Sequence, residues 1–197
     1  MADTLNLSLW FPGFDAELML PRLVEVLRYF PFSESRSGVQ YVSVQPVDWG
    51  EPTLFEEGFE PGVSADEASL VLAEYAQMDL ALTMEAYWDL WMLDPEKKEW
   101  ALRPEKVTFT AQGLEFDEGA FAESGHMMID FGLDFPFLHE DVDLNAEDAL
   151  RVKANVAALI EFTHRVERNC NTTGRVLWSE SEENLAQKLI ARLQQVQ

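Results

Sequence analysis

The chain has 197 residues, 47% of them hydrophobic, so it is long enough to bury a core without disulfide bonds or a structural metal. Its formal net charge is −22, with 31 acidic and 7 basic residues among the first 150, and a surface of this sign repels nucleic-acid phosphates and anionic lipids. The chain has a single cysteine and does not start with a basic and apolar leader, so we predict a cytoplasmic protein. We predict no membrane span, because the sequence has no run of 18 apolar residues.

Two long tracts of the sequence contain no lysine or arginine. Residues 37–96 hold thirteen acidic side chains, and residues 107–150 hold eleven more. From Arg151 to the end the balance reverses, with seven basic against five acidic residues. A negative surface favours a basic partner and speeds its encounter at low salt, but acidic side chains also simply keep a protein in solution. Both interpretations stay open at this point.

The first 94 residues predict a ferredoxin-like unit with the element order βαββαβ. The patterns behind it are strand alternation, apolar residues at helical spacing, and a capping box at Ser64–Glu67. The predicted elements are strands over 5–9, 39–47, 53–59 and 82–92 and helices over 20–30 and 64–75. Right-handed connections would place both helices on one face of an antiparallel four-stranded sheet.

Residues 95–197 predict further antiparallel strands followed by two C-terminal helices. The elements expected here are strands over 99–103, 107–111, 127–135 and 176–178 and helices over 145–170 and 179–193. Asn145 is the predicted N-cap of the first helix, because Glu147 and Asp148 follow in the first turn, where acidic residues suit the helix dipole. We see no repeat or low-complexity linker, so we expect this extension to pack on the first unit as one compact α+β domain.

One face of the predicted sheet combines aromatic with polar side chains. The candidates for binding a ligand or partner on this face are Trp10, Tyr41, Glu85, Tyr87, Asp89 and Trp91. Such rings stack on bases in RNA-binding sheets, but the negative charge argues against nucleic acid. Beside carboxylates the same rings suit a sugar or a cationic ligand. In the alternative interpretation, residues 99–135 cover this face and make it an interior layer.

Four residues are candidates for metal ligands, namely His126, Asp130, His139 and Asp141. On a strand, residues four positions apart lie roughly 13 Å from each other, whereas ligands of one ion lie within about 2.0–2.6 Å of it. The region after Asp141 mimics a calcium loop, but Ala146 and Val152 stand where that loop needs glycine and glutamate. The sequence therefore predicts no metal and no cofactor, although a looser cation site near His139 stays open.

Motifs for nucleophilic or nucleotide chemistry are missing from the sequence. It contains no G-x-S-x-G, no P-loop and no G-x-G-x-x-G. Cys170 and His164 lie six residues apart on a predicted helix, about 600° of rotation, so they face different sides. We therefore assign no catalytic residue.

Two functions from different classes remain. In the first, a non-catalytic interaction protein uses its acidic surface and aromatic anchors to bind a basic protein, as immunity-type or antitoxin-type inhibitors do; this likeness is one of charge alone. In the second, a small enzyme or ligand-binding domain has a pocket between the sheet face and the extension, with Glu85, Asp89, His126 and Asp130 as its polar groups. At least three of these side chains around one concave site would favour the second. We predict the first, and make no prediction of oligomeric state.

Overall fold

The secondary structure follows the local sequence patterns. The computed structural model describes residues 3–94, 96, 99–139, 144–180 and 184–194. Its strands are β1 (Thr4–Trp10), β2 (Val39–Pro46), β3 (Phe55–Val63), β4 (Leu80–Asp94), β5 (Glu99–Gln112), β6 (Met127–Leu133) and β7 (Gly174–Ser179). Its helices are α1 (Ala16–Leu27), α2 (Ala65–Leu72), α3 (Phe121–Ser124), α4 (Phe135–Leu138), α5 (Ala146–Asn169) and α6 (Leu185–Gln194), with 3₁₀ turns at Ala73–Tyr75 and Phe116–Gly119.

The two short strands expected over 99–103 and 107–111 form one continuous strand, β5. Its residues pair with β4 along its whole length, from Glu99 to Gln112. Pro104 lies within it, where its missing N–H costs no ladder bond to β6 because that pairing begins only at Thr108.

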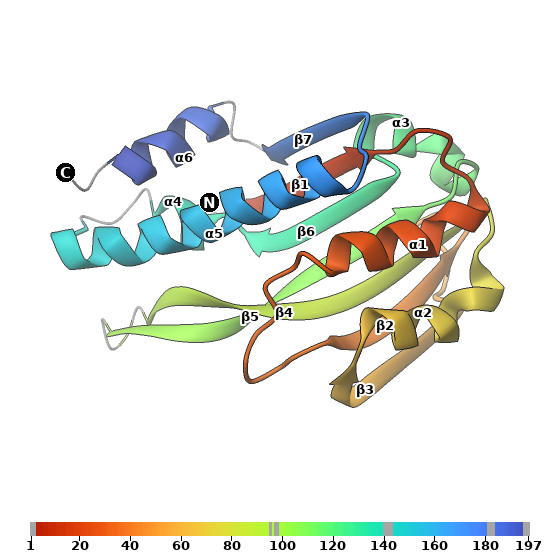
Figure 1. The fold of residues 1–197 in the computed structure, drawn as a ribbon, viewed down its shortest axis with the longest axis horizontal. Coiled ribbons are helices and arrows are strands. Elements are labelled where there is room, and N and C mark those ends of the chain that lie inside the picture. The colour runs from red at the N-terminus through yellow and green to blue at the C-terminus, as the bar shows by residue number, and fades with distance from the viewer. Residues whose placement is uncertain (1–2, 95, 97–98, 140–143, 181–183, 195–197) are drawn as a thin grey trace.

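All seven strands form one antiparallel sheet with the order β3-β2-β4-β5-β6-β1-β7 (Figure 1). The βαββαβ order along the chain is confirmed, but the expected ferredoxin-like pairing is wrong, because that sheet needs β1 between β3 and β4. Here β1 lies between β6 and β7, where Leu7 is opposite Ile129 on one side and Leu177 on the other. Strands from residues 1–94 and 95–197 therefore interleave in a single sheet.

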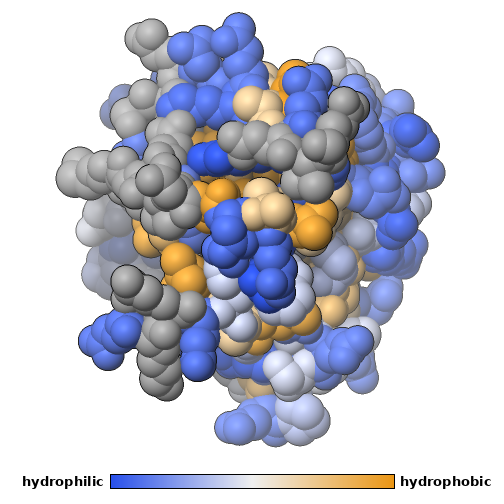
Figure 2. Space-filling model, turned by 90° about the vertical axis from the view of Figure 1, so that its left-hand side faces the viewer, coloured by the Kyte–Doolittle hydropathy of each residue, from blue (hydrophilic) through white to orange (hydrophobic). Residues whose placement is uncertain are grey.

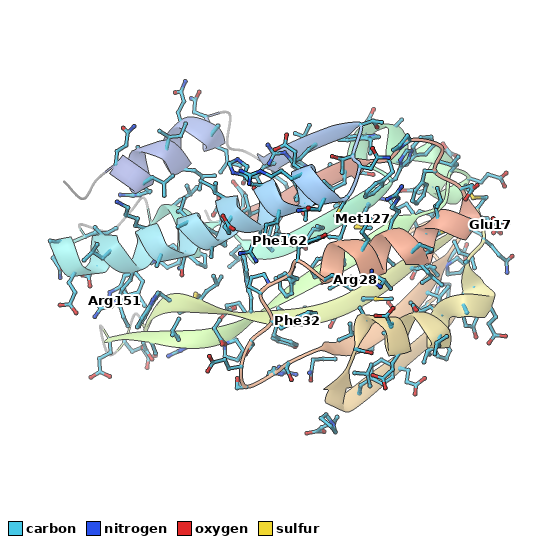
Figure 3. The ribbon with its side chains drawn as sticks, viewed as in Figure 1. Glu17, Arg28, Phe32, Met127, Arg151 and Phe162 are labelled. Carbon is cyan, nitrogen blue, oxygen red and sulfur yellow. The ribbon has the colours of Figure 1, made fainter. Side chains whose placement is uncertain are left out.

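One face of the sheet is covered by helices. In Figure 1, α1, α2 and α5 lie in front of the sheet, and the two helices of the βαββαβ segment share this face as expected. Side chains that point toward them are buried, among them Leu7, Met84 and Phe109 at 0% exposure. Phe162 of α5, labelled in Figure 3, packs its ring 5.6 Å from Phe30 and 6.0 Å from Phe131. We call this side of the sheet the covered face.

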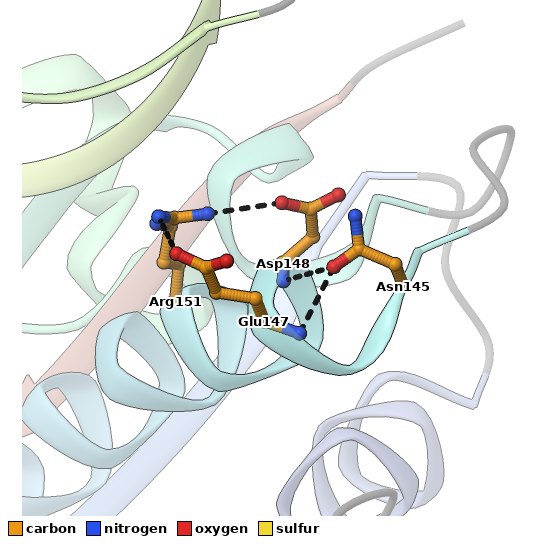
Figure 4. Close-up of polar contacts among 4 residues, drawn as sticks. All are labelled: Asn145, Glu147, Asp148 and Arg151. Atoms are coloured by element: carbon orange, nitrogen blue, oxygen red, sulfur yellow. Dashed lines mark hydrogen bonds and ion pairs between the residues drawn. The ribbon is translucent and has the colours of Figure 1, made fainter.

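Helix ends are stabilised by the capping residues that the sequence predicts. The Asn145 side chain accepts hydrogen bonds from the backbone N–H groups of Glu147 and Asp148, both at 2.9 Å (Figure 4). Arg151 closes the same turn by pairing with both carboxylates. The capping box of α2 also forms, with Ser64 and Glu67 bonded to each other's backbone N–H. Both predicted caps are confirmed.

Hydrophobic residues are scattered over the end of the molecule that holds α6 and the start of α5. Figure 2 shows small hydrophobic patches there between hydrophilic residues. Leu150 and Ile190 are each 51% exposed, which is ordinary for single apolar side chains on a protein surface. Across the described residues, none of the helices combines the length and apolar character that crossing a bilayer requires.

Candidate functional site

The sheet face that points away from α1, α2 and α5 carries the polar and aromatic side chains, and we call it the open face. Strand register aligns one row of side chains across it, in the order Tyr41, Glu85, Thr108, Asp130, Asn6 and Trp178. Most of its side chains are half-buried, in contrast to the covered face. β5 and β6 extend the sheet in its own plane, so the interpretation in which residues 99–135 form a layer over this face is wrong.

Two segments contact the open face among the described residues. Residues 33–36 reach Tyr87 and Asp89 at the free edge of β4, and α3 lies over one corner. At that corner the Trp10 indole N–H donates to the Phe121 carbonyl at 3.0 Å, and the Gln112 amide donates to the Ser124 hydroxyl at 3.0 Å. These bonds hold α3 against the end of β1 and β5. Elsewhere on the face most of the described side chains are half-buried.

The predicted binding residues of β2 and the first part of β4 are each engaged with a neighbour on the open face. Tyr41 donates its hydroxyl to Glu56 at 2.6 Å, and this bond raises the pKa of Tyr41 to about 12. Glu85 accepts from Lys106 at 2.9 Å, and the Lys106 pKa is raised by this bond. Tyr87 lies beneath the Arg36 guanidinium, 3.6 Å from its ring centre. These contacts neutralise part of the face and fix the orientation of its rings.

Asp89 and Trp91, the last two predicted binding residues, serve the fold. The Asp89 carboxylate accepts from the Ser33 hydroxyl at 2.7 Å and the Glu34 backbone N–H at 3.0 Å, which anchors the loop after α1. The backbone of Trp91 is held by Asn155 of α5. Along β4, Glu85 and Trp91 are six residues apart, roughly 20 Å. The Trp91 ring lies 5.5 Å from the Arg151 guanidinium of α5, so the six predicted residues do not form one site.

The pocket hypothesised between sheet and extension does not form from its four polar groups. His126 accepts from the Phe11 backbone N–H through Nδ1 at 3.0 Å, and its ring stacks 4.5 Å from Phe14, so it is a packing residue. Burial lowers the pKa of His126. Asp130 accepts from the Gly132 N–H at 2.7 Å, and β5 separates it from Glu85. These side chains and Asp89 do not converge on one concave site.

His139 and Asp141 are the other metal-ligand candidates. Asp141 falls outside the described residues. His139 is 0% exposed, and its ring lies 4.0 Å from Phe135 and 4.9 Å from Trp100. Among the described residues, neither of its ring nitrogens has a hydrogen-bond partner. Burial, and then the charge of Arg192, lower its pKa to about 4. Within the part of the chain that the structure describes, no three His, Cys, Asp or Glu side chains are grouped to hold a metal ion.

A hollow of about 410 Å³ lies on the open face between β1, β7 and α3, and we call it the tryptophan hollow. It is lined by Ser8, Trp10, Glu123, Ser124, Val176 and Trp178. Its volume lies within the range of roughly 300–1,000 Å³ that is usual for ligand sites. The sequence pointed to Trp10 but not to Trp178, because nothing local shows that β7 pairs with β1.

A smaller hollow of about 270 Å³ opens where β5 and β6 separate, on the covered face. Glu105 lies in it among apolar side chains that include Leu90, Met92, Phe131 and Phe135. This burial raises the pKa of Glu105, with Arg103 opposing the change. None of the four polar groups of the hypothesised pocket lines either hollow.

Comparisons with protein-family models, with curated proteins and with solved structures found no match to this chain. The function has to be inferred from the chemistry of the open face itself.

Proposed function

We propose that this protein is a non-catalytic interaction module that binds a basic protein through its open face. The observation that supports this most directly is a sheet face on which aromatic rings stand among carboxylates. Glu56, Glu85 and Asp130 belong to it, while Lys106 is paired with Glu85 and Arg36 is stacked on Tyr87. A basic partner would meet rings whose orientation is already fixed, within a strongly negative field.

Rings and carboxylates would have different effects on such a complex. Tryptophan and tyrosine at a desolvated centre carry most of the affinity of an interface. Charges at the rim chiefly raise the association rate. At 0.1 M salt, dissolved ions largely screen the attraction between charges that are more than about 10 Å apart. With 31 acidic and 7 basic residues in the first 150, long-range attraction of a basic partner is expected to be strong at low salt.

A cytoplasmic location fits this proposal. Cys170 is the single cysteine of the chain and is buried, and burial raises the pKa of its thiol to about 12. A protein with one inert thiol gains nothing from an oxidising compartment.

Affinity capture at low salt, followed by elution in a salt gradient, tests the proposal. The bait proteins are the wild type, an open-face variant (Glu56→Gln, Glu85→Gln, Asp130→Asn), and a control (Asp66→Asn, Glu74→Gln, Glu161→Gln) with the same change in charge on α2, the following 3₁₀ turn and α5. We expect basic partners that elute as salt rises, with association at least about tenfold slower for the open-face variant and nearly unchanged for the control.

Two results would contradict the proposal. One is the recovery of neutral or acidic partners in complexes that salt does not weaken. The other is an equal loss of association in the open-face variant and the control, because net charge rather than this face would then explain the binding.

A further inference from the structure

We infer that the tryptophan hollow binds an arginine side chain, an inference that rests on the proposed function and names the group of the basic partner that it recognises. The hollow lies on the open face, where β1 and β7 run side by side and α3 forms one wall. Its shape, its fixed rings and the carboxylate at its rim point to this occupant.

The hollow exists because small and large residues alternate across β1 and β7. Ser8 is opposite Val176, Asn6 is opposite Trp178, and Trp10 is opposite Gly174. Ser8 is 0% exposed and forms the floor, with an indole ring on each side. A Cβ at Gly174 would lie 3.2 Å from the Trp10 ring, so the absence of a side chain there gives this ring its place.

The N–H group of each indole ring already donates a hydrogen bond within the protein. The Trp10 N–H donates to the Phe121 carbonyl at 3.0 Å, and the Trp178 N–H donates to the Ser8 hydroxyl at 2.9 Å. The rings therefore offer only their apolar surfaces to an occupant. Because these bonds fix the rings before binding, an occupant would lose little free energy in ordering them.

The remaining polar groups of the hollow leave one unpaired charge. Ser124 is engaged twice, since its hydroxyl accepts from Gln112 at 3.0 Å and donates to the Ala120 carbonyl at 2.9 Å. Glu123 is exposed at the rim, and its carboxylate bonds to none of the described residues. Basic side chains are absent from the residues that line the hollow. The Ser8 hydroxyl accepts from Trp178 and keeps its own O–H, so it is a single neutral donor at the floor. An anionic ligand would find no positive charge among the lining residues.

Arginine matches this set of groups better than the alternatives. Its planar guanidinium stacks on an indole ring and forms paired hydrogen bonds to a carboxylate, while its methylene stem suits apolar walls. Lysine carries a point charge that is more strongly hydrated, so it loses more on entering an apolar hollow. Val176, 49% exposed at the edge, adds an apolar contact for the partner's neighbouring residues.

N-acetyl-argininamide, which carries one guanidinium and no other charge, is the probe for this inference. It is titrated into the uniformly ¹⁵N-labelled full chain while the indole N–H resonances of the six tryptophans are followed. We expect saturable shifts for Trp10 and Trp178 and none for Trp88, which is buried under the helices at 1% exposure. Glu123→Gln should weaken binding at least about threefold, and Glu115→Gln, an exposed neighbour outside the hollow, should not.

Several results would overturn the inference. Unchanged Trp10 and Trp178 resonances would do so, as would equal shifts with N-acetyl-alaninamide or glucose, or equal weakening by both glutamine variants. If the hollow fails while salt-sensitive capture of a basic protein persists, the inference falls and the proposed function stands on other residues of the open face. If the probe binds as expected but no basic protein is captured, the hollow is a guanidinium site and the proposed function falls.

Discussion

The two faces of the sheet differ in what fixes their side chains. On the covered face, Leu7, Met84 and Phe109 are fixed by packing against helices. On the open face, Tyr41 and Glu85 are held by pairwise polar contacts that leave them half-exposed. The same period-2 alternation produces both faces, so the side chains that stabilise the fold and those proposed to bind a partner lie on opposite sides of the sheet. Changes on the covered face should therefore cost folding free energy, and changes on the open face should mainly alter binding.

Phe162→Ala should show the largest loss. The ring is 1% exposed and lies among Phe30, Phe109 and Phe131, so its removal leaves a cavity at the centre of the covered face. We expect a decrease of about 3–5 kcal/mol in the free energy of unfolding, measured by urea denaturation.

Met128→Ala is the matched change on the open face, because Met128 lies half-buried on β6. It should cost less than about 1.5 kcal/mol, since its cavity is open to solvent. Equal losses for the two variants would mean that the two faces do not differ in the way described.

Asn155→Ala tests whether the covered face tolerates a polar group only when that group is fully bonded. Asn155 is 2% exposed, accepts from the Trp91 N–H, and donates to the Trp91 and Pro136 carbonyls, each at 2.9 Å. Its loss leaves three backbone groups without partners, so we expect a cost of about 2–4 kcal/mol in urea denaturation. Asn169→Ala, at the exposed end of α5, is the control, and an equal effect would contradict the assignment.

His139→Phe examines a buried polar group whose ring nitrogens have no hydrogen-bond partner in the part of the chain that the structure describes. The folded-state pKa is lowered from 6.5 to about 4, so below pH 6.5 the unfolded chain takes up a proton that the folded protein excludes. Stability is therefore lost as the pH falls from about 6.5 toward 4, by roughly 2 kcal/mol at pH 4.5. Phenylalanine should abolish this part of the loss.

Urea midpoints at pH 7.0 and 4.5 measure the effect as a difference between wild type and variant, so that carboxylates titrating in both proteins cancel. His164→Gln, an exposed change on α5, serves as the control. The same dependence on pH in wild type and His139→Phe would refute the expectation.

Glu105→Gln should have the smallest effect on the free energy of unfolding. The contribution of Glu105 should depend on pH in the opposite direction to that of His139. Burial raises the pKa of Glu105, so the folded protein binds its proton more tightly than the unfolded chain does. Stability is then lost as the pH rises above the pKa that Glu105 has in the unfolded chain. Removing the carboxylate should therefore stabilise the protein at pH 7, by about 0.5 kcal/mol or less. Melting temperatures at pH 4 and 7, with exposed Glu99→Gln as control, measure it; a lower melting temperature at pH 7 would count against it.

Local patterns in the sequence determined the elements and the faces of this protein. The caps at Ser64 and Asn145 and the alternation along β4 could be predicted because each depends on residues a few positions apart. The same alternation correctly assigned Glu85 and Tyr87 to the polar face.

Only the tertiary structure decided which strands are neighbours. Leu7 would fit beside any apolar strand, and its real partners lie more than a hundred residues away, so the hydrophobic period could not distinguish β6 and β7 from β3 and β4. This choice brings Trp178 to Ser8 and creates the tryptophan hollow. Periodicity along one strand determines which face of the sheet a side chain points to. A site between two distant strands depends on which strands pair, and that pairing depends on packing across the whole sheet.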